Sequence, residues 1–309
     1  MNGVKWALCA LLLAASGQPA AAQMSNLPDE VRLAISEMGT TLNTPIVRRT
    51  FALMQPLQAS RAGLSVTKDL AYGADPLQKM DLYATAGIAA ASAPIVVFIH
   101  GGGFTNGDKH GVDNVAAFFA RHGLLGVNMN YRLAPAVSWP AQSLDIGSAV
   151  DWLQTNAARY GGDPHRIFLI GHSSGAAIAA SYVLDQSIST VRDGVVGAVL
   201  ISGPYGFEPL QGPAHEYYGD DRETAAGRQP RTHVYESKLP MLIVAAEFDP
   251  PDLGAESHEL ATAICVRDGK CPPFVWLNGH NHISEVASID TRDHRLGREI
   301  LDFVRAVGR

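Results

Sequence analysis

The chain has 309 residues, of which 47% are hydrophobic and 17% are charged. This composition describes an ordinary globular protein with enough apolar surface for a sizeable core, and the length suits one large α/β domain or two small ones. The formal net charge of −6 gives no reason to expect nucleic-acid binding, which depends on basic surfaces.

The first residues have the pattern of a secretory signal peptide. Lys5 precedes an apolar stretch from Trp6 to Ala15, and a run of alanines ends at Ala22. The apolar stretch is too short to span a bilayer comfortably, so we expect cleavage after Ala22 and no membrane span. Residues 1–22 are then a signal peptide, and the mature protein is secreted or periplasmic. The alternative is a stray apolar helix at the start of a cytosolic protein.

The next segment is expected to be helical over residues 27–60, with breaks at Pro45 and Pro56. Two strands follow within 64–73 and 79–85, joined by the turn "GADPLQ".

Further along the chain, apolar runs of strand length alternate with helical patterns. We expect strands at 94–100, 124–132, 166–171, 195–202, 240–247 and 273–278, and helices at 143–161, 174–185, about 253–267 and 293–307. Buried strands that alternate with helices indicate a mostly parallel sheet with helices on both faces. The sequence therefore predicts an α/β fold in a single domain over 23–309.

Two segments depart from this alternation. Residues 23–65 form an N-terminal helical segment that we expect to act as a small cap across the mouth of the site. Residues 203–238 are rich in Gly, Pro, Tyr and charge, and they leave the carboxyl end of a predicted strand. Ligands bind beyond such strand ends in parallel sheets, so this insertion is placed to wall a substrate site. A surface loop without substrate contact is the alternative.

The motif "GHSSG" contains a candidate nucleophile. The pattern Gly-x-Ser-x-Gly fits only with Ser173 at its centre, between Gly171 and Gly175. The glycines permit a sharp turn from strand to helix that lifts the central serine above the sheet edge. Ser174 starts the helix, so its backbone N–H points back toward the nucleophile at the positive end of the helix dipole.

The string "IHGGGF" follows another predicted buried strand directly. Consecutive glycines leave backbone N–H groups unshielded, and the developing negative charge on a carbonyl oxygen needs such preorganised donors. We therefore assign the N–H groups of Gly102, Gly103 and Ser174 to an oxyanion hole. A plain glycine turn is the alternative.

A base and an orienting acid are needed to activate a serine, and they are expected after it in the order acid, base. Asp249 follows a strand end, with Glu247 and Asp252 as competing carboxylates. His280 and His282 both follow the last strand, and the residues alone do not choose between them. Their His-x-His spacing also occurs in metal sites, but no nearby carboxylate or cysteine cluster supports a metal.

Two cysteines remain after the expected cleavage, since Cys9 lies within the signal peptide. Cys265 and Cys271 are separated by five residues. In an oxidising compartment, such an isolated pair predicts a small structural disulfide. Two free thiols are the alternative.

These motifs together resemble the α/β-hydrolase superfamily, from about residue 66 to the C-terminus. The resemblance is narrower to the esterase/lipase group, with its hormone-sensitive-lipase-like enzymes, bacterial feruloyl-esterase-like proteins and kynurenine formamidases. It rests on "HGGGF" followed by "GDK", on "NYRLAP", "WPA", "GGDPHRI", "GHSSGA" and "EFDP". The residue after the candidate nucleophile is a serine. In this respect the motif resembles that of the feruloyl-esterase and formamidase branch more than that of central hormone-sensitive-lipase-like members.

The resemblance implies a catalytic triad of Ser173, Asp249 and His282, the last chosen over His280 because an apolar residue follows it. It also implies that Arg132 and Asp145 are structural partners. The expected activity is hydrolysis of short-chain or aryl carboxylic esters through an acyl-enzyme, without a cofactor or metal. The alternatives are an amidase such as an arylformamidase, and an inactive hydrolase fold that serves in binding.

Overall fold

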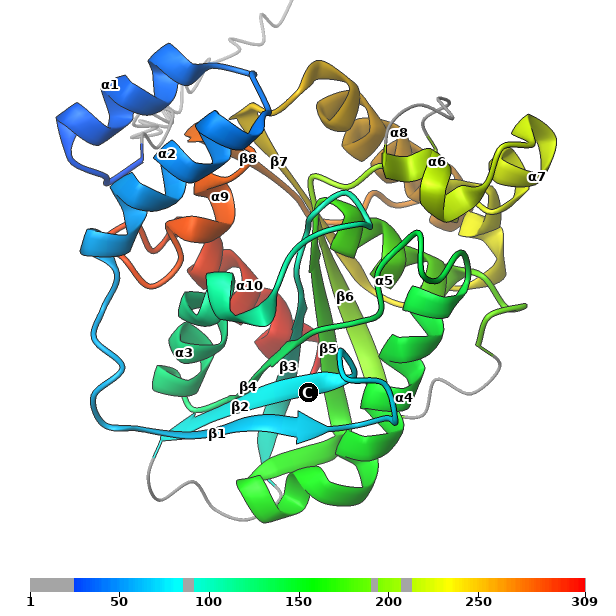
Figure 1. Ribbon diagram of the computed structural model, residues 1–309, viewed down its shortest axis with the longest axis horizontal. Helices are drawn as coiled ribbons and strands as arrows, with labels where there is room; N and C mark the ends of the chain where they lie inside the picture. Colours follow the sequence, from blue (N-terminus) through cyan, green and yellow to red (C-terminus); the bar gives the residue numbers. More distant parts are fainter. Residues whose placement is uncertain (1–24, 86–91, 190–193, 207–212, 309) are drawn as a thin grey trace, which may run out of the picture.

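A computed structural model describes residues 25–85, 92–189, 194–206 and 213–308 of the chain. The predicted signal peptide, residues 1–22, and Cys9 lie outside the described residues. Within the described part, one sheet of eight strands has the order β1-β2-β4-β3-β5-β6-β7-β8 (Figure 1). The strands are β1 Leu64–Ala71, β2 Lys79–Thr85, β3 Ala93–Ile99, β4 Leu125–Met129, β5 Gly162–His172, β6 Val195–Ile201, β7 Met241–Phe248 and β8 Phe274–Asn281.

The sheet is mostly parallel, as the alternation of strands and helices predicts. β1 pairs antiparallel with β2, and β2 pairs antiparallel with β4, whereas all later pairings are parallel. The α-helices are α1 Asp29–Met38, α2 Thr44–Met54, α3 Asp113–Arg121, α4 Ala141–Asn156, α5 Ser174–Leu184, α6 Pro213–Tyr218, α7 Arg222–Gly227, α8 Pro251–Asp268, α9 Ser284–Ala287 and α10 Arg295–Val307. Short 3-10 helices occupy η1 Gln55–Leu57, η2 Lys109–Val112, η3 Ala157–Tyr160 and η4 Pro230–Glu236.

Two hydrophobic cores lie on opposite faces of the sheet, because side chains alternate between faces along a strand. In β3, Ile95, Val97 and Ile99 join the core beneath α4, α5 and α8. Val96 and Phe98 join the other core, beneath α3 and α10. Figure 1 shows α4 and α5 on one side of the central strands, and α3 and α10 on the other. The fold is therefore a three-layer α/β arrangement with parallel strand ends at one edge.

The N-terminal helices pack beside the C-terminal end of the sheet. Their apolar side chains form a small cluster with Ala287 of α9, made of Leu27, Val31, Ile35, Met38 and Met54. The helical segment is interrupted over 39–43, just before the expected break at Pro45, because Pro45 itself lies in the first turn of α2, where a missing N–H costs no helical hydrogen bond. The Asn43 side chain caps this helix by accepting the N–H of Ile46 at 3.0 Å.

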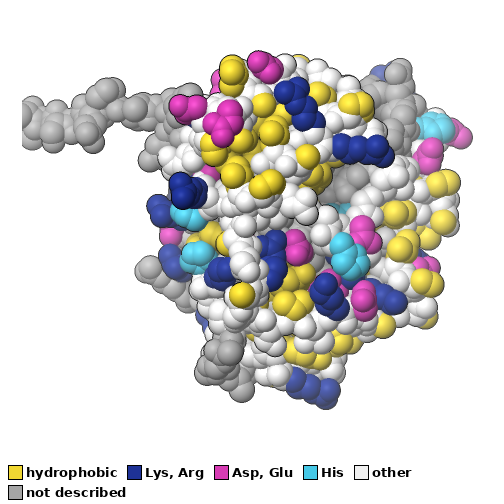
Figure 2. Space-filling view, turned by 60° about the vertical axis from the view of Figure 1, so that its left-hand side comes forward, with side chains coloured by type: hydrophobic (Ala, Val, Ile, Leu, Met, Phe, Trp, Pro, Cys, Tyr) yellow, Lys and Arg dark blue, Asp and Glu magenta, His cyan; other side chains and the backbone are white. Residues whose placement is uncertain are grey.

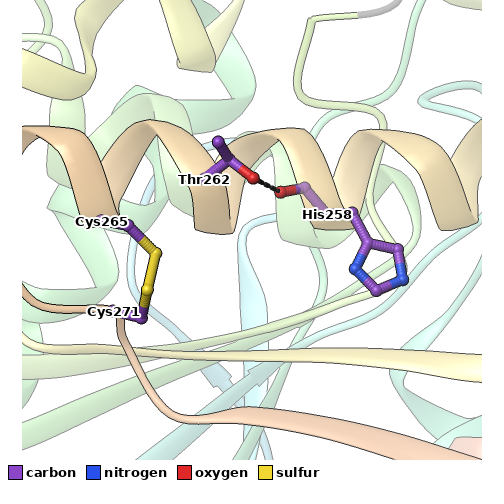
Figure 3. The surroundings of a disulfide bond; sticks show 4 residues. All are labelled: His258, Thr262, Cys265 and Cys271. Atoms are coloured by element: carbon purple, nitrogen blue, oxygen red, sulfur yellow. Dashed lines mark hydrogen bonds between the residues drawn. A yellow bond between two sulfur atoms is a disulfide. The ribbon is translucent and has the colours of Figure 1, made fainter.

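The cysteines form the predicted disulfide. Cys265 lies in the last turns of α8, and Cys271 lies in the loop that leads to β8 (Figure 3). Thr262, one turn before Cys265, donates its hydroxyl to the carbonyl of His258 at 2.8 Å. The bond ties the end of the helix to the start of the last strand.

Charged side chains of both signs are interspersed with hydrophobic ones over the face drawn in Figure 2. None of the helices in the described ranges combines the length and hydrophobicity needed to cross a membrane.

Candidate active site

Ser173 sits on a sharp turn between β5 and α5. Its backbone has φ 55° and ψ −127°, a conformation that non-glycine residues rarely adopt. A Cβ atom on Gly171 would lie 2.4 Å from the Gly175 carbonyl oxygen, and one on Gly175 would lie 2.3 Å from the Ile99 carbonyl oxygen. Both glycines of the motif are therefore needed for the close approach of α5 to the strand ends.

The glycine loop after β3 runs beside this turn. β3 and β5 are parallel neighbours, with Ile99 opposite Gly171. A Cβ atom on Gly101 would lie only 2.8 Å from the Cβ atom of Ser173, and one on Gly102, whose φ is 141°, would lie 1.9 Å from the Asn106 carbonyl oxygen. The fold thus brings the backbone of this loop, which continues through Gly103, against the candidate nucleophile. Ser174 is the first residue of α5.

Asp249 and His282 meet at the same edge of the sheet, after β7 and β8. The distance from His282 Nδ1 to Asp249 Oδ1 is 2.9 Å, and both side chains are buried. Because a carboxylate only accepts, Nδ1 carries the hydrogen, and the neutral ring presents a lone pair at Nε2. That nitrogen is buried and has no hydrogen-bond partner among the described residues. The ring therefore has the tautomer that a general base requires.

The carboxyl group of Asp249 is held as an anion. Burial raises its pKa, but the hydrogen bond and charge of His282 and the donors Ala246 N–H and Ser202 Oγ–H outweigh burial, so the pKa lies below 3.8. Both of these donors contact Oδ2 at 2.7 Å. Oδ1 is thereby left for His282.

His172 connects the serine turn to His282. Its ring centroid lies 4.7 Å from that of His282, and its Nε2–H donates to the His282 carbonyl oxygen at 2.8 Å. Burial, followed by the charge that His282 carries when it is protonated, lowers the pKa of His172 to about 3, so the His172 ring stays neutral. Since Ser173 is the next residue, this contact places the serine turn beside the His282–Asp249 pair.

His280 occupies a different environment. Its Nε2 lies 2.9 Å from Asp293 Oδ2 and its Nδ1 lies 3.2 Å from Ser284 Oγ, so both ring nitrogens are engaged. Asp293 also accepts the Ser25 hydroxyl at 2.7 Å. This histidine links the N-terminal segment to the chain after α9.

The two competing carboxylates lie away from the histidine ring. Glu247 is exposed and accepts the N–H of Gly279 at 2.7 Å. Asp252 is exposed in the first turn of α8. Of the three carboxylates near the end of β7, Asp249 is the one in contact with His282.

The cluster contains three further polar side chains that the sequence analysis did not identify: His172, Ser202 and Glu285. Ser202 follows β6, and Glu285 lies in α9, where both are completely buried. His172 is the variable residue of the Gly-x-Ser-x-Gly pattern, so the motif does not mark it. Only the adjacency of the β5, β6 and β8 ends brings the three together.

A trio of possible metal ligands also falls here, namely His172, His282 and Glu285. Two ring nitrogens of this trio are already donors: His172 Nε2 donates to a carbonyl oxygen and His282 Nδ1 donates to Asp249. These nitrogens carry hydrogens and have no lone pair for an ion. The arrangement fits hydrogen bonding rather than metal ligation.

The insertion packs against the glycine loop. Tyr217 of α6 stacks on Phe104 with ring centroids 4.7 Å apart, and the N–H of Trp139 donates to the Tyr217 carbonyl at 2.9 Å. Of the expected loop over 203–238, the described residues include α6, α7 and η4. The insertion therefore lies next to the candidate oxyanion loop, as its departure from β6 predicts.

Comparisons with known proteins find similar esterases. The BD-FAE family model matches residues 80–196, which contain both glycine motifs. Esterase LipQ of Mycobacterium tuberculosis is 24% identical over 78% of this chain and 62% of its own length. Over these regions the chain is similar to esterases.

Solved structures share the α/β-hydrolase fold over most of the chain. Esterase B from Lactobacillus rhamnosis matches with a TM-score of 0.74 and 19% identity, over 90% of this chain and 94% of that chain. The same esterase is known in a form inhibited by a tributyrin phosphonate, which matches with a TM-score of 0.70 and 20% identity over 91% and 97% of the two chains. These likenesses show the fold.

The matched curated relatives of this chain are longer proteins. The chain spans 62% of LipQ and 41% of the probable carboxylic ester hydrolase LipM from the same organism, which is 29% identical over 62% of this chain. Within the shared region, the expected partners Arg132 and Asp145 form an ion pair with a 2.6 Å contact. Asp145 is fully buried and also accepts the Gln78 amide at 2.7 Å.

Proposed function

We propose that this protein hydrolyses carboxylic esters as a serine hydrolase, with Ser173 as nucleophile, His282 as base and Asp249 as the orienting acid. The observation that carries this proposal is the buried His282 ring next to the strained Ser173 turn. Its Nδ1 donates to Asp249, and its Nε2 has no hydrogen-bond partner in the described part of the chain. The esterase names of the relatives LipQ and LipM support the same reaction.

The proposed reaction begins when Ser173 Oγ attacks the ester carbonyl carbon and its proton passes to His282 Nε2. The Asp249 carboxylate stabilises the imidazolium, and the N–H groups of Gly102, Gly103 and Ser174 bind the oxyanion. His282 then gives the proton to the leaving alkoxide oxygen, which leaves an acyl-enzyme on Ser173. Water, deprotonated by His282, attacks the acyl carbonyl, releases the acid and regenerates the serine.

The decisive variant is Ser173→Ala. We expect it to lower kcat for a nitrophenyl butyrate ester by about 10⁴-fold or more, and to abolish labelling by a fluorophosphonate probe. Ser65→Ala, at an exposed serine of the edge strand β1, is the matched control and should keep full activity and labelling. Retained turnover by the Ser173 variant would contradict the proposed nucleophile.

The substrate class is proposed as short-chain or aryl esters. The inhibitor named for the structurally similar esterase B is a phosphonate analogue of tributyrin, a short-chain ester. A panel of nitrophenyl esters from acetate to palmitate, with methyl ferulate and N-formylkynurenine, tests this class against the amidase alternative. Faster turnover of the formamide than of any ester would favour the amidase.

We also propose that the protein acts outside the cytoplasm after removal of residues 1–22. The Cys265–Cys271 disulfide supports this proposal, because structural disulfides persist mainly in oxidising compartments. N-terminal sequencing of the mature protein is expected to begin at Gln23, and an intact N-terminus in the cytoplasmic fraction would contradict export.

A further inference from the structure

A second carboxyl group lies buried beside Asp249. Glu285, in the single turn of α9, is completely shielded from solvent. Its Oε2 lies 2.9 Å from Ser202 Oγ, and its Oε1 lies 3.2 Å from His172 Nε2 and 3.8 Å from His282 Nδ1. Neither Lys nor Arg is among these contacts, although a buried glutamate usually has such a partner. The reaction described above gives this group no role.

The hydrogen atoms around Ser202 show which carboxyl group is ionised. The hydroxyl has a single hydrogen, yet it lies within hydrogen-bond distance of both Asp249 Oδ2 and Glu285 Oε2. Asp249 also receives the N–H groups of Ala246 and His282, so the donors converge on Asp249 as on an anion. The Ser202 hydrogen therefore goes to Asp249, and the contact with Glu285 needs a hydrogen from Glu285 itself.

The other oxygen of Glu285 leads to the same assignment. Oε1 is buried and has no hydrogen-bond partner within the described ranges. The N–H of His172 is 3.2 Å away but is already directed at the His282 carbonyl oxygen at 2.8 Å. An ionised carboxylate would leave this oxygen charged and unsolvated, which costs far more than leaving a neutral carbonyl oxygen there.

We propose that Glu285 is kept as a neutral carboxylic acid and acts as a positioning residue for the triad. Its O–H donates to Ser202 Oγ, which fixes the Ser202 hydrogen on Asp249 Oδ2 and leaves Oδ1 for His282. The proposal rests on the proposed function, because it assigns a role to the partner of the proposed base. Glu285 itself touches no reacting atom.

Electrostatics agree with the neutral form. Burial, followed by the negative charge of Asp249, raises the pKa of Glu285 well above its ordinary value. A second anion 3.8 Å from His282 Nδ1 would compete with Asp249 for its hydrogen and overstabilise the imidazolium. The neutral acid supplies a hydrogen bond without adding that charge.

The pH profile of Glu285→Gln tests the protonation state. The glutamine amide is neutral and can donate to Ser202, so we expect kcat and KM within about twofold of wild type and an unchanged acidic limb of kcat/KM. If Glu285 were ionised, removal of a charge this close to His282 would lower the acidic limb by about one unit or more. That shift would overturn the proposal.

The positioning role is tested by Glu285→Ala, which removes the donor. We expect kcat to fall about tenfold with KM little changed, and rescue of kcat in the glutamine variant. Wild-type kcat in a folded Glu285→Ala protein would overturn the role. Glu299→Gln, at an exposed position of α10, is the matched control and should change neither kcat nor the pH profile.

Infrared spectroscopy tests the protonation state of Glu285 without a measurement of activity. It therefore applies even if the Glu285→Ala protein does not fold. The spectrum near neutral pH should contain a protonated-carboxyl C=O band that disappears in Glu285→Gln and persists in Glu299→Gln and Ser173→Ala. A difference spectrum without this loss would overturn the proposal. An active Ser173→Ala would instead overturn the proposed function and leave the infrared result intact.

Discussion

The Asp249 carboxylate has three donors, two on one oxygen and one on the other. Ala246 N–H and Ser202 Oγ–H hold Oδ2, and His282 Nδ1–H meets Oδ1. Asp249→Asn should therefore lower kcat by about 10⁴-fold, because an amide nitrogen facing Nδ1 forces the wrong tautomer on His282. Steady-state kinetics of the purified variant measure this fall.

Glu247→Gln is the matched control for that variant. Glu247 lies two residues away, is exposed and accepts the N–H of Gly279. We expect its kcat to stay within about twofold of wild type. A larger loss in Glu247→Gln than in Asp249→Asn would assign the acid to Glu247.

Substitution of His280 should lower stability, whereas substitution of His282 should lower activity. His280→Ala leaves Asp293 and Ser284 without the buried imidazole, so we expect a loss of about 2–4 kcal/mol in the free energy of unfolding with kcat retained by the folded protein. His282→Ala should instead lower kcat by about 10⁴-fold or more. Thermal unfolding and kinetics on both variants check this, and loss of kcat in folded His280→Ala would reverse the assignment.

The two histidines show a limit of prediction from residue patterns. Both follow the predicted last strand, 273–278, and they are two residues apart, so spacing alone does not choose between them as the base. The structure distinguishes them by partners from distant parts of the chain, Asp293 for His280 and Asp249 for His282. Ser173 could be predicted because its turn depends on glycines next to it in sequence. Ser202 and Glu285 could not, since their role arises from strand ends that meet only in the folded sheet.

At the level of elements, continuous apolar strands were predictable, and so was α5, although every residue of that helix is buried. β3 and β7 stand out as unbroken hydrophobic runs of strand length. α3 has no predicted counterpart, because residues 115–120 are a short apolar run, and periodicity cannot distinguish a buried helix from a strand in such a run. The helices of the 203–238 insertion are short, and their Gly- and Pro-rich surroundings indicate a loop.

The insertion is held to the end of α5 by an ion-pair cluster around His233. Nδ1 of His233 lies 2.8 Å from Glu236 Oε1, and Nε2 lies 2.8 Å from the Gly227 carbonyl oxygen and 3.4 Å from Asp185 Oδ2. Burial lowers the pKa of His233, but the Glu236 and Gly227 hydrogen bonds and the Asp185 charge outweigh it and raise the pKa above 6.5. The cluster is therefore strongest when the ring is protonated.

This pKa predicts a pH-dependent contribution of the insertion to stability. A group whose folded-state pKa is raised stabilises the protein below the unfolded pKa of about 6.5, and this stabilisation is lost as the pH rises through the folded value. We expect His233→Gln to lower the free energy of unfolding by about 1 kcal/mol near pH 6 and by less near pH 9. Thermal unfolding at the two pH values measures the difference.

The exposed His165 provides the control, because its side chain lies at the surface near the start of β5. His165→Gln should leave the melting temperature unchanged at both pH values. An equal effect of His233→Gln at the two pH values would contradict the ion-pair interpretation.

On the scale of the whole molecule, the N-terminal segment is joined to the region that carries His282. Gln58 donates its amide to the Ala287 carbonyl at 3.2 Å, and the N–H of Ala59 donates to the Asp290 carbonyl at 2.8 Å. Asn281, the residue before His282, donates its amide to Thr50 of α2 at 3.3 Å. The segment predicted as a cap thus forms hydrogen bonds with the chain on both sides of the turn after β8. Its helical pattern alone does not indicate these contacts.

This arrangement predicts that the N-terminal helices and the α/β sheet unfold together. Ile35 of α1 is fully buried in the cluster with Met54 and Ala287, so Ile35→Ala should lower the free energy of unfolding by about 2–5 kcal/mol. Leu33, on the same helix, is 62% exposed, and Leu33→Ala should change it by at most about 0.5 kcal/mol. If the helices and the sheet form a single cooperative unit, the unfolding transitions of Ile35→Ala followed by far-ultraviolet circular dichroism and by tryptophan fluorescence shift together to lower denaturant concentration. Separate transitions for the two probes would show instead that the N-terminal helices fold independently of the sheet.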